Sequence, residues 1–373
     1  MMSVLTIMSL ILAGIHFGMP LAYYYYVKRN WLNKPWNVKT NGNYKPNVTV
    51  IIPTYNEADL IEAKLNNIKD QEYSKDKLEV IVVDSASEDN TPNIVEKWAE
   101  KNSDLKLVLL KEFVRRGMVF ALNYASKYVS KDSEVVIFTD VDAFWEQNTL
   151  KRVVKYFADP SIGAVTTGIV PLEKDDRYFE TTYRNYYNVI RIAESKLHST
   201  PIHNGTLVAF RRELLEKING LPIHTGNADS TPASLIAFMN YRAIQIDDTI
   251  VKEPIRGNQV GRKVRRAQHL ILHFLQTKRY AKRLDIYRKS VFDKIWKIEC
   301  WLHIVNPWLL LSAIVLILSD ALLFSSPVSL TLIIAGLTLL ALKKIFRVWS
   351  LQQLYLIMAT VRNLWTREIA WKK

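Results

Sequence analysis

The stretch between residues 47 and 142 constrains the fold most, because short apolar runs alternate there with amphipathic stretches. Continuous apolar, β-branched runs are typical of strands that are buried on both faces, and apolar residues at helical spacing are typical of helices. The predicted strands are 47–52, 79–83, 105–110 and 135–138, and the predicted helices are 58–69, 91–102 and 118–129. This alternation predicts an α/β domain with a mainly parallel sheet that helices cover on both faces.

Polar residues directly follow three of the predicted strands, in the segments 53–57, 84–87 and 140–142. In parallel sheets, ligands bind beyond the carboxyl ends of the strands, so we expect the three segments to line one crevice. The sequence has neither GxGxxG after the first strand nor GxxxxGKS/T. An ordinary dinucleotide site and a P-loop are therefore not supported.

The third polar segment is Asp140-Val141-Asp142. In an extended chain, residues two apart point to the same side, so both carboxylates can converge on one hard cation such as Mg²⁺ or Mn²⁺. The pattern alone also fits a solvated strand end or a helix N-terminus. A tyrosine in the first polar segment, Tyr55, offers a ring that can stack on a base. Together these groups suit a nucleotide diphosphate that carries a sugar.

Long stretches without charge indicate membrane segments. Residues 1–27 carry no charge and exceed the roughly 20 residues that cross a bilayer. Aromatic and then basic residues follow, so we interpret 1–27 as a retained transmembrane helix, 28–44 as a linker and the large middle region as cytoplasmic. Two further charge-free runs predict a transmembrane hairpin over 300–342. The remaining segment, 343–373, is expected to form a helix that lies on the membrane.

The net charge of +14 is concentrated in one part of the chain, since residues 252–289 hold 12 Lys and Arg but 2 Asp and Glu. Amphipathic patterns over 261–299 predict interfacial helices, whose basic residues would lie against anionic membrane lipids. Nucleic acid is not an expected partner, because membrane segments bracket this region. The single cysteine, Cys300, excludes an intrachain disulfide and suits a reducing cytoplasm.

Several motifs together carry a family resemblance. They are Ile52-Pro53-Thr54-Tyr55-Asn56-Glu57, Val83-Asp84-Ser85-Ala86-Ser87, Gly117 with Ala121-Leu122-Asn123, Asp140-Val141-Asp142, His203-Asn204-Gly205-Thr206, Phe210-Arg211-Arg212 and Asn219-Gly220. With these motifs the chain resembles the membrane-bound, inverting glycosyltransferases of family 2, including processive polysaccharide synthases and ceramide glucosyltransferase-like enzymes. The resemblance implies a GT-A fold, with a catalytic domain over 45–260.

The resemblance also implies roles for single residues. The implied nucleotide-sugar-binding residues are Pro53, Thr54, Tyr55, Glu57, Asp84, Gly117, Asp140 and Arg262, and the implied acceptor-side residues are Asn204, Gly205 and Thr206. Asp84 would read the base, Asp142 would be the main metal ligand, and Asp140 would contact the ribose or the metal. Met118 stands where relatives often have a lysine. Arg115 or Arg116 would supply the missing phosphate contact, unless the two are only a solvated pair in a loop.

Two implied catalytic residues are Asp229 and Arg265. An inverting transfer needs a general base for the acceptor hydroxyl, and Asp229 is the carboxylate of the stretch 226–230 where relatives place it. Asp247 or Asp248 remains an alternative base, although both could belong to a turn at a strand end. Arg265 corresponds to the arginine that contacts the diphosphate in relatives, unless residues 262–266 are only a basic turn that faces lipid.

Arg266 replaces the tryptophan that lies beneath the acceptor sugar in processive relatives. The expected function is therefore transfer of a sugar, with a UDP-sugar favoured as donor, to a lipid or lipid-linked acceptor at the cytoplasmic membrane face. A processive polysaccharide synthase is the alternative. A non-catalytic membrane scaffold that binds nucleotide sugars is a further alternative, although a scaffold needs none of the retained aspartates.

Overall fold

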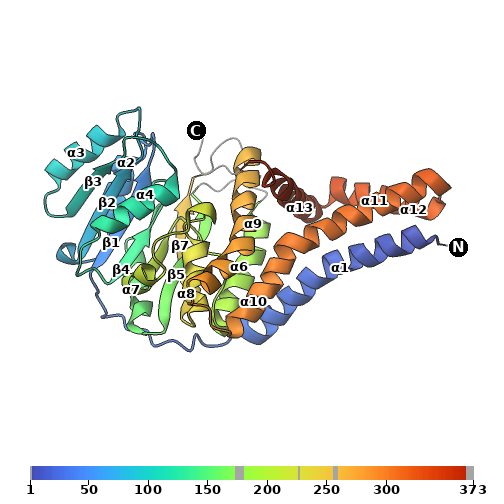
Figure 1. Cartoon of the computed structure of the whole chain (residues 1–373), viewed down its shortest axis with the longest axis horizontal. Coiled ribbons are helices and arrows are strands. Elements are labelled where there is room, and N and C mark those ends of the chain that lie inside the picture. The colour runs from blue at the N-terminus through green and yellow to red at the C-terminus, as the bar shows by residue number, and fades with distance from the viewer. Residues whose placement is uncertain (1, 173–179, 226, 255–258, 367–373) are drawn as a thin grey trace.

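The computed structural model describes residues 2–172, 180–225, 227–254 and 259–366 (Figure 1). A sheet domain lies at one end of the molecule, and long helices extend from it toward the other end, where the N-terminus lies. Residue 226 of the expected base stretch and residues 367–373 of the expected C-terminal helix lie outside the described residues.

The sheet has seven strands in the order β3-β2-β1-β4-β6-β5-β7. Their bounds are β1 Val48–Thr54, β2 Leu78–Asp84, β3 Lys106–Lys111, β4 Val135–Phe138, β5 Ile162–Pro171, β6 Val208–Arg211 and β7 Arg242–Glu253. The first four strands are parallel, β6 runs antiparallel to both β4 and β5, and β5 pairs in parallel with β7. The expectation of a mainly parallel sheet is therefore confirmed.

Helices cover both faces of this sheet. On one face, α2 (Ile61–Lys69), α3 (Thr91–Lys101) and α5 (Thr149–Val154) pack on alternate strand residues such as Val50 and Ile52. On the other face lie α4 (Met118–Ala125), α7 (Arg212–Lys217) and α8 (Ser230–Phe238), against strand residues such as Ile51. Successive strand residues point to opposite faces of the sheet. A continuous apolar strand therefore contributes side chains to two hydrophobic cores, one on each face. Short 3₁₀ turns are Lys75–Lys77, Ser126–Tyr128, Lys155–Ala158 and Ile223–Thr225.

Three further helices connect the sheet domain to the long helices. Their bounds are α6 Glu180–Leu197, α9 Gln259–Arg283 and α10 Val291–Cys300. The second core takes in Phe274 of α9 and both Phe292 and Trp296 of α10. The amphipathic pattern in this region therefore reflects packing against the sheet domain as well as any contact with lipid.

Two helical segments of the described residues are long and apolar enough to cross a membrane, Val4–Leu32 and Val291–Phe324. The first joins α1 (Val4–Val27) to a π-helical turn, and the second joins α10 to a π-helical turn and α11 (Asn306–Phe324). α1 packs along α11, and α12 (Pro327–Leu342) returns beside α11. A third candidate span results only if α12 and α13 (Lys344–Arg362) are counted together as one span. The two helices are bent by 104° relative to each other.

The helices extend past two of the expected boundaries. α1 ends at Val27, and a π-helical turn continues it to Leu32, inside the expected linker 28–44. α10 is continuous with α11, so it is the first part of a candidate span rather than a separate interfacial helix within 261–299. The local pattern hid this continuity, because Asp293, Lys294 and Lys297 interrupt the apolar residues of α10 where it packs on the sheet domain.

The sequence left open that Asp247 and Asp248 belong to a turn at a strand end, and the structure contradicts this interpretation. Both lie inside β7, which continues to Glu253. A register shift between Thr166 and Gly168 of the neighbouring strand marks an irregularity beside them. Polar residues at such an irregularity interrupt the apolar pattern by which a strand is recognised.

Candidate active site

The predicted site residues converge on two adjoining cavities beyond the carboxyl ends of β1 and β4. The smaller one, of about 80 Å³, is called here the strand-end cavity, and the larger one, of about 290 Å³, the central cavity. Both are lined by Pro53, Met118, Asp140, Glu253 and Arg266. A ligand can therefore extend from one cavity into the other past Asp140.

Most predicted residues line the cavity that their implied role requires. Pro53, Thr54, Tyr55, Glu57, Gly117, Asp140, Asp142 and Arg262 line the strand-end cavity. Asn204, Gly205, Thr206, Asp229 and Arg265 line the central cavity. The expectation that separate polar segments meet in one crevice is confirmed, because β1 lies between β2 and β4 in the sheet.

Asp84 is buried and does not line the strand-end cavity. Its carboxylate accepts hydrogen bonds from the backbone N–H of Ser87 at 3.0 Å and from the Ser87 hydroxyl at 2.5 Å. Ser85, the next residue, does line the cavity. The role of Asp84 in reading the base stays a prediction, and its visible role is to hold the loop after β2.

Gly117 is the N-cap residue of α4 and has a φ of 111° and a ψ of 164°. This conformation is open to glycine and strained for residues with a Cβ atom. Gly117 and Met118 both line the strand-end cavity, so the first turn of α4 faces it. A helix N-terminus presents free backbone N–H groups, which favour a phosphate.

A buried lysine, Lys64, lies beneath the Asp140-Val141-Asp142 loop, and the sequence did not single it out. Its ammonium donates to the Thr139 hydroxyl at 2.9 Å and to the Ala143 carbonyl, and it lies 4.4 Å from the centre of the Trp145 ring. Burial lowers the pKa of Lys64 to about 7, while the charges of Asp140 and Asp142 oppose that shift. Lys64 thus fixes both ends of the loop.

Asp140 is surrounded by other carboxylates. Burial raises the pKa of Asp140 to about 8, and Asp142, Glu253 and Asp229 contribute in the same direction, while Arg266 opposes them. A cation between Asp140 and Asp142 would relieve this repulsion. The residue set therefore fits a divalent ion.

No group of three or more His, Cys, Asp or Glu side chains among the described residues could hold a metal by itself. Two carboxylates fit an ion that completes its coordination with phosphate oxygens and water.

Asp229 caps the N-terminus of α8 and points one oxygen into the central cavity. Its Oδ1 accepts from the backbone N–H and the hydroxyl of Ser230, the latter at 3.0 Å. Its Oδ2 faces Gly205, where an added Cβ atom would lie 3.2 Å from that oxygen and 3.7 Å from Oδ2 of Asp140. Burial raises the pKa of Asp229. Gly205 therefore allows the two carboxylates to approach one point.

The two alternative bases lie elsewhere. Asp247 forms an ion pair with Lys196 at 3.2 Å and accepts from the indole N–H of Trp36 at 3.1 Å. Asp248 pairs with Lys155 at 2.5 Å. Neither aspartate lines the strand-end or the central cavity, so the geometry favours Asp229.

Arginines of α9 reach the junction of the two cavities. Arg262 and Arg266 lie one turn apart, and both approach Oε1 of Glu253, at 3.7 and 3.4 Å. Of the two cavities, Arg265 lines only the central one, while Arg266 lines both. The sequence singled out Arg266 only because it replaces the tryptophan of processive relatives. It gave no sign that Glu253, the last residue of β7, belongs to the site.

The structure distinguishes between the two candidate arginines before α4. The guanidinium of Arg115 lies 3.5 Å from the centre of the Tyr55 ring, and both residues line the strand-end cavity. Arg116 instead pairs with Glu112 at 2.9 Å, and this glutamate also accepts from Ser85. Arg115 is therefore the one that can contact a ligand in this cavity.

The wall of the central cavity includes polar groups that the sequence did not assign. Arg191 of α6 donates to the side-chain oxygen of Asn204 at 3.1 Å. Within the described part of the chain, the ring nitrogens of His203 and the hydroxyl of Thr206 are buried without a hydrogen-bond partner. Burial and the charge of Arg191 lower the pKa of His203 to about 3, so the ring is neutral.

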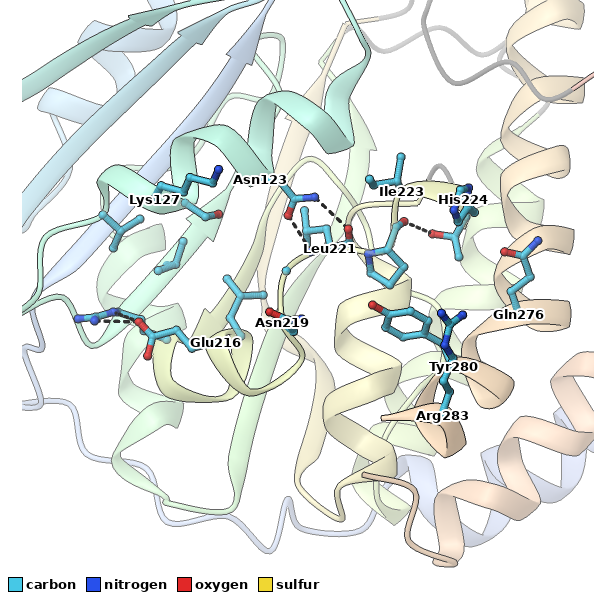
Figure 2. A pocket seen from close by; sticks show the side chains of 18 of the residues that line it. Asn123, Lys127, Glu216, Asn219, Leu221, Ile223, His224, Gln276, Tyr280 and Arg283 are labelled. Atoms are coloured by element: carbon cyan, nitrogen blue, oxygen red, sulfur yellow. Dashed lines mark hydrogen bonds and ion pairs between the residues drawn. The ribbon is translucent and has the colours of Figure 1, made fainter. Parts of the chain in front are cut away.

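A separate cavity of about 730 Å³ lies on the same side of the sheet, between α4, α7, the loop after α7 and α9 (Figure 2). The amide of Asn123 donates to the Leu221 carbonyl and accepts from its backbone N–H, at 2.9 and 2.7 Å, which ties α4 to this loop. Glu216, its one lining carboxylate, pairs with Arg212. This cavity therefore lacks the paired aspartates of the junction, despite its larger volume.

Comparison with known proteins agrees with this geometry. The model of the family described as "Glycosyl transferase family 2" matches residues 49–219. A solved structure of a mannosyltransferase from Pyrobaculum calidifontis, in complex with GDP-Man and Mn²⁺, is 43% identical. It aligns with a TM-score of 0.87 over 98% of this chain and 100% of that chain.

Two curated relatives match over shorter stretches. An O-antigen chain rhamnosyltransferase of Salmonella typhimurium (strain LT2) is 34% identical over 48% of this chain and 56% of its own length. A poly-beta-1,6-N-acetyl-D-glucosamine synthase of Staphylococcus aureus (strain MSSA476) is 34% identical over 39% of this chain and 34% of its own length. The matched region thus spans about half and a third of these two relatives. The expected family and the GT-A fold are both confirmed, and the chain belongs to glycosyltransferase family 2.

Proposed function

We propose that this protein transfers one sugar, with inversion, from a nucleotide diphosphate sugar to an acceptor hydroxyl at the membrane surface. The observation that carries the proposal is the approach of Asp229 and Asp140 to one point beside Gly205. Asp140 lines both the strand-end and the central cavity, while Gly205 and Asp229 line the central one. A donor diphosphate in the first cavity and an acceptor in the second would bring the sugar between them.

Asp229 acts as the general base in this proposal. It takes the proton of the acceptor hydroxyl, the hydroxyl oxygen attacks the anomeric carbon, and the nucleoside diphosphate leaves from the opposite face. A raised pKa suits this role, because a base works best when its pKa approaches the working pH. The second oxygen of Asp229 stays bound to Ser230, which fixes the direction of the carboxylate.

Positive charge around the strand-end cavity would stabilise the departing diphosphate. Arg115, Arg262 and Arg266 line that cavity, together with the first turn of α4. Asp140 and Asp142 would hold a divalent cation, Mg²⁺ or Mn²⁺, which supplies further positive charge at the diphosphate oxygens when bound. Such preorganised charge contributes strongly to transferase catalysis.

GDP-mannose is the first donor to test. The sequence alone favoured a UDP-sugar, but the mannosyltransferase that is 43% identical to this chain binds GDP-Man with Mn²⁺. The two candidate spans and the basic residues that follow the first support a membrane protein with a cytoplasmic catalytic domain. An acceptor that is a lipid, or is linked to one, follows from that position.

The test is nucleoside diphosphate release by the purified full chain in the presence of extracted membrane lipids as the acceptor, with GDP-mannose and UDP-N-acetylglucosamine compared in Mn²⁺ and in Mg²⁺. We expect release with one donor and no release by Asp142→Ala. Undiminished turnover of that variant would refute the metal site. No turnover with a panel of GDP- and UDP-sugars, combined with tight donor binding, would favour the non-catalytic scaffold.

A processive synthase is the second candidate, supported by the similarity to the poly-beta-1,6-N-acetyl-D-glucosamine synthase. The described residues offer two candidate spans, or three at most, which is few for a translocation channel within one chain. Product length separates the two candidates. Long polymer made by the purified protein would contradict single transfer.

A further inference from the structure

One buried cation beneath the reaction centre takes no part in the proposed proton transfer or in binding the diphosphate. Lys64 of α2 is fully buried and lines neither the strand-end nor the central cavity. Burying an ammonium costs free energy, and an apolar side chain would fill the same space without that cost. Natural proteins accept such local costs mainly at functional sites. The contacts of the ammonium therefore indicate what Lys64 does.

The ammonium of Lys64 joins the two ends of the loop that carries the paired aspartates. It donates to the hydroxyl of Thr139, the residue before Asp140, at 2.9 Å. It also donates to the carbonyl of Ala143, the residue after Asp142. A hydrogen bond at each end fixes the span of the loop. The relative placement of the two carboxylates is therefore set by a side chain that lies beneath them.

Thr139 extends this contact to the acceptor-side segment. An ammonium can donate but cannot accept, so the Thr139 hydroxyl must accept from Lys64, and its own proton is left for another acceptor. The hydroxyl donates that proton to the Thr206 carbonyl at 2.7 Å. Both threonines are almost fully buried, where a hydrogen bond is electrostatically stronger than in water. The direction of each hydrogen bond from Lys64 to Thr206 is therefore determined.

The Thr206 carbonyl follows directly after Gly205, beside which Oδ2 of Asp140 and Oδ2 of Asp229 face one point. Lys64 thus contacts, directly or through one hydroxyl, two backbone segments that border this point. Hydrogen-bonding partners behind the ligands of a metal site orient those ligands, and their loss typically lowers metal affinity or activity roughly 10- to 100-fold. A residue that lines neither cavity can therefore decide how the carboxylates are aimed.

We propose that Lys64 is a positioning residue of the transfer site, which holds the loop of Asp140 and Asp142 against the Gly205 segment through Thr139. This inference rests on the proposed function, because it concerns the cation site and the reaction centre assigned there. The sign of the effect on metal binding separates position from charge. Loss of a positive charge near two aspartates would strengthen the binding of a cation, whereas loss of their aim would weaken it.

The test is direct binding of Mn²⁺ to the purified full chain, followed by the loss of the EPR signal of the free ion. Asp142→Ala is the blank for ions that bind elsewhere. Lys64→Met keeps the length of the side chain and removes the ammonium, and we expect it to weaken the Asp142-dependent binding by roughly 10- to 100-fold. Lys69→Met is the matched control, because it removes the same charge from the same helix, while Lys69 donates to Asn102 and Asp104. It should bind Mn²⁺ as the wild type does.

Three results of this measurement would overturn the positioning role. The first is tighter or unchanged binding of Mn²⁺ in Lys64→Met. The second is equal weakening in Lys69→Met, which would show that any loss of charge from α2 has the same effect. The third is a wild type that binds no more Mn²⁺ than Asp142→Ala, which would refute the cation site itself.

Substitution of Thr139 tests the link to the Gly205 segment without removing the buried ammonium. Thr139→Val keeps the shape of the side chain but cannot donate to the Thr206 carbonyl, whereas Thr139→Ser keeps the hydroxyl. With saturating Mn²⁺ and donor, and extracted membrane lipids as the acceptor, we expect turnover to fall about tenfold or more in Thr139→Val only. Both variants are assayed well below their melting temperatures, so a loss of stability alone does not change the rate. Equal turnover of the two would overturn the link.

Turnover by the wild type separates failure of this inference from failure of the proposed function. Unchanged Mn²⁺ binding in Lys64→Met, together with an active wild type, would refute the inference and leave the proposed function standing. Absent turnover by the wild type, together with Mn²⁺ binding that weakens in Lys64→Met, would refute the proposed transfer. In that case the role of Lys64 at the cation site would stand.

Discussion

Asp140 and Asp229 each direct Oδ2 toward the same point beside Gly205, although they come from different elements, the end of β4 and the start of α8. One aspartate belongs to the expected cation site and the other is the expected base. Their common point is open because residue 205 has no Cβ atom.

Replacing this glycine tests the relationship directly. In Gly205→Ala, the new Cβ atom would lie 3.2 Å from Oδ2 of Asp229, so that carboxylate must move. We expect turnover to fall roughly tenfold or more, with little change in melting temperature. Gly168→Ala is the control, since its Cβ atom meets Ile250 at 3.8 Å, an ordinary contact. Equal effects of the two substitutions would argue against a shared reaction point.

The identity of the base is tested by two isosteric substitutions. Asp229→Asn should lower the rate of transfer by about 10²- to 10⁴-fold while donor binding is retained, because the amide cannot accept the proton. Asp247→Asn should leave the rate nearly unchanged, because Asp247 pairs with Lys196 outside both cavities. Single-turnover measurements with saturating donor check both expectations. A large rate loss in Asp247→Asn alone would reverse the assignment.

We expect alanine substitutions of Arg115 and of Arg116 to have different effects on donor binding and on stability. Arg115→Ala removes the group stacked on Tyr55 in the strand-end cavity, so we expect the KM for the donor to rise by roughly 2- to 30-fold at an unchanged melting temperature. Arg116→Ala leaves the buried Glu112 without its ion pair, so the melting temperature should fall and the KM should stay constant. Steady-state kinetics and thermal unfolding of both variants decide the matter, and the reverse pattern would show that Arg116 contacts the donor.

The buried histidine of the central cavity predicts a dependence of stability on pH. The pKa of His203 is lowered to about 3 in the fold, against about 6.5 for an exposed histidine. Between these values the unfolded chain binds a proton that the folded chain does not. Stability is therefore lost as pH falls below about 6.5, by up to about 1.4 kcal/mol per pH unit for this group. Thermal unfolding at pH 7 and pH 5 should show a smaller difference for His203→Gln than for the wild type, and an identical difference would contradict the prediction.

Much of the catalytic domain could be predicted because its signals are local. The first four strands follow from continuous apolar runs, and the crevice follows from the polar residues that end three of them. Lys64 shows the limit of this reasoning. It lies in a correctly predicted helix, where a lysine is ordinarily solvated, and it is buried because α2 packs beneath the loop after β4.

Glu253 and Arg191 were missed for a related reason. Each lies in an element far along the chain from the Asp140 loop, the end of β7 and the middle of α6. The strand order brings β7 to the far edge of the sheet, and only its last residue turns back to the junction of the cavities. No spacing in the sequence reports such a meeting.

The amino-acid sequence alone determined the class of the fold, the polar strand ends, the paired aspartates and the charge-free helices. Hydrophobic periodicity and charge act locally along the chain, so these features are visible without coordinates. Only the tertiary structure places Asp229 at the central cavity and Asp247 outside it, and Arg115 at the strand-end cavity while Arg116 pairs with Glu112. Those choices depend on which distant segments pack together, and packing is a property of the whole folded chain.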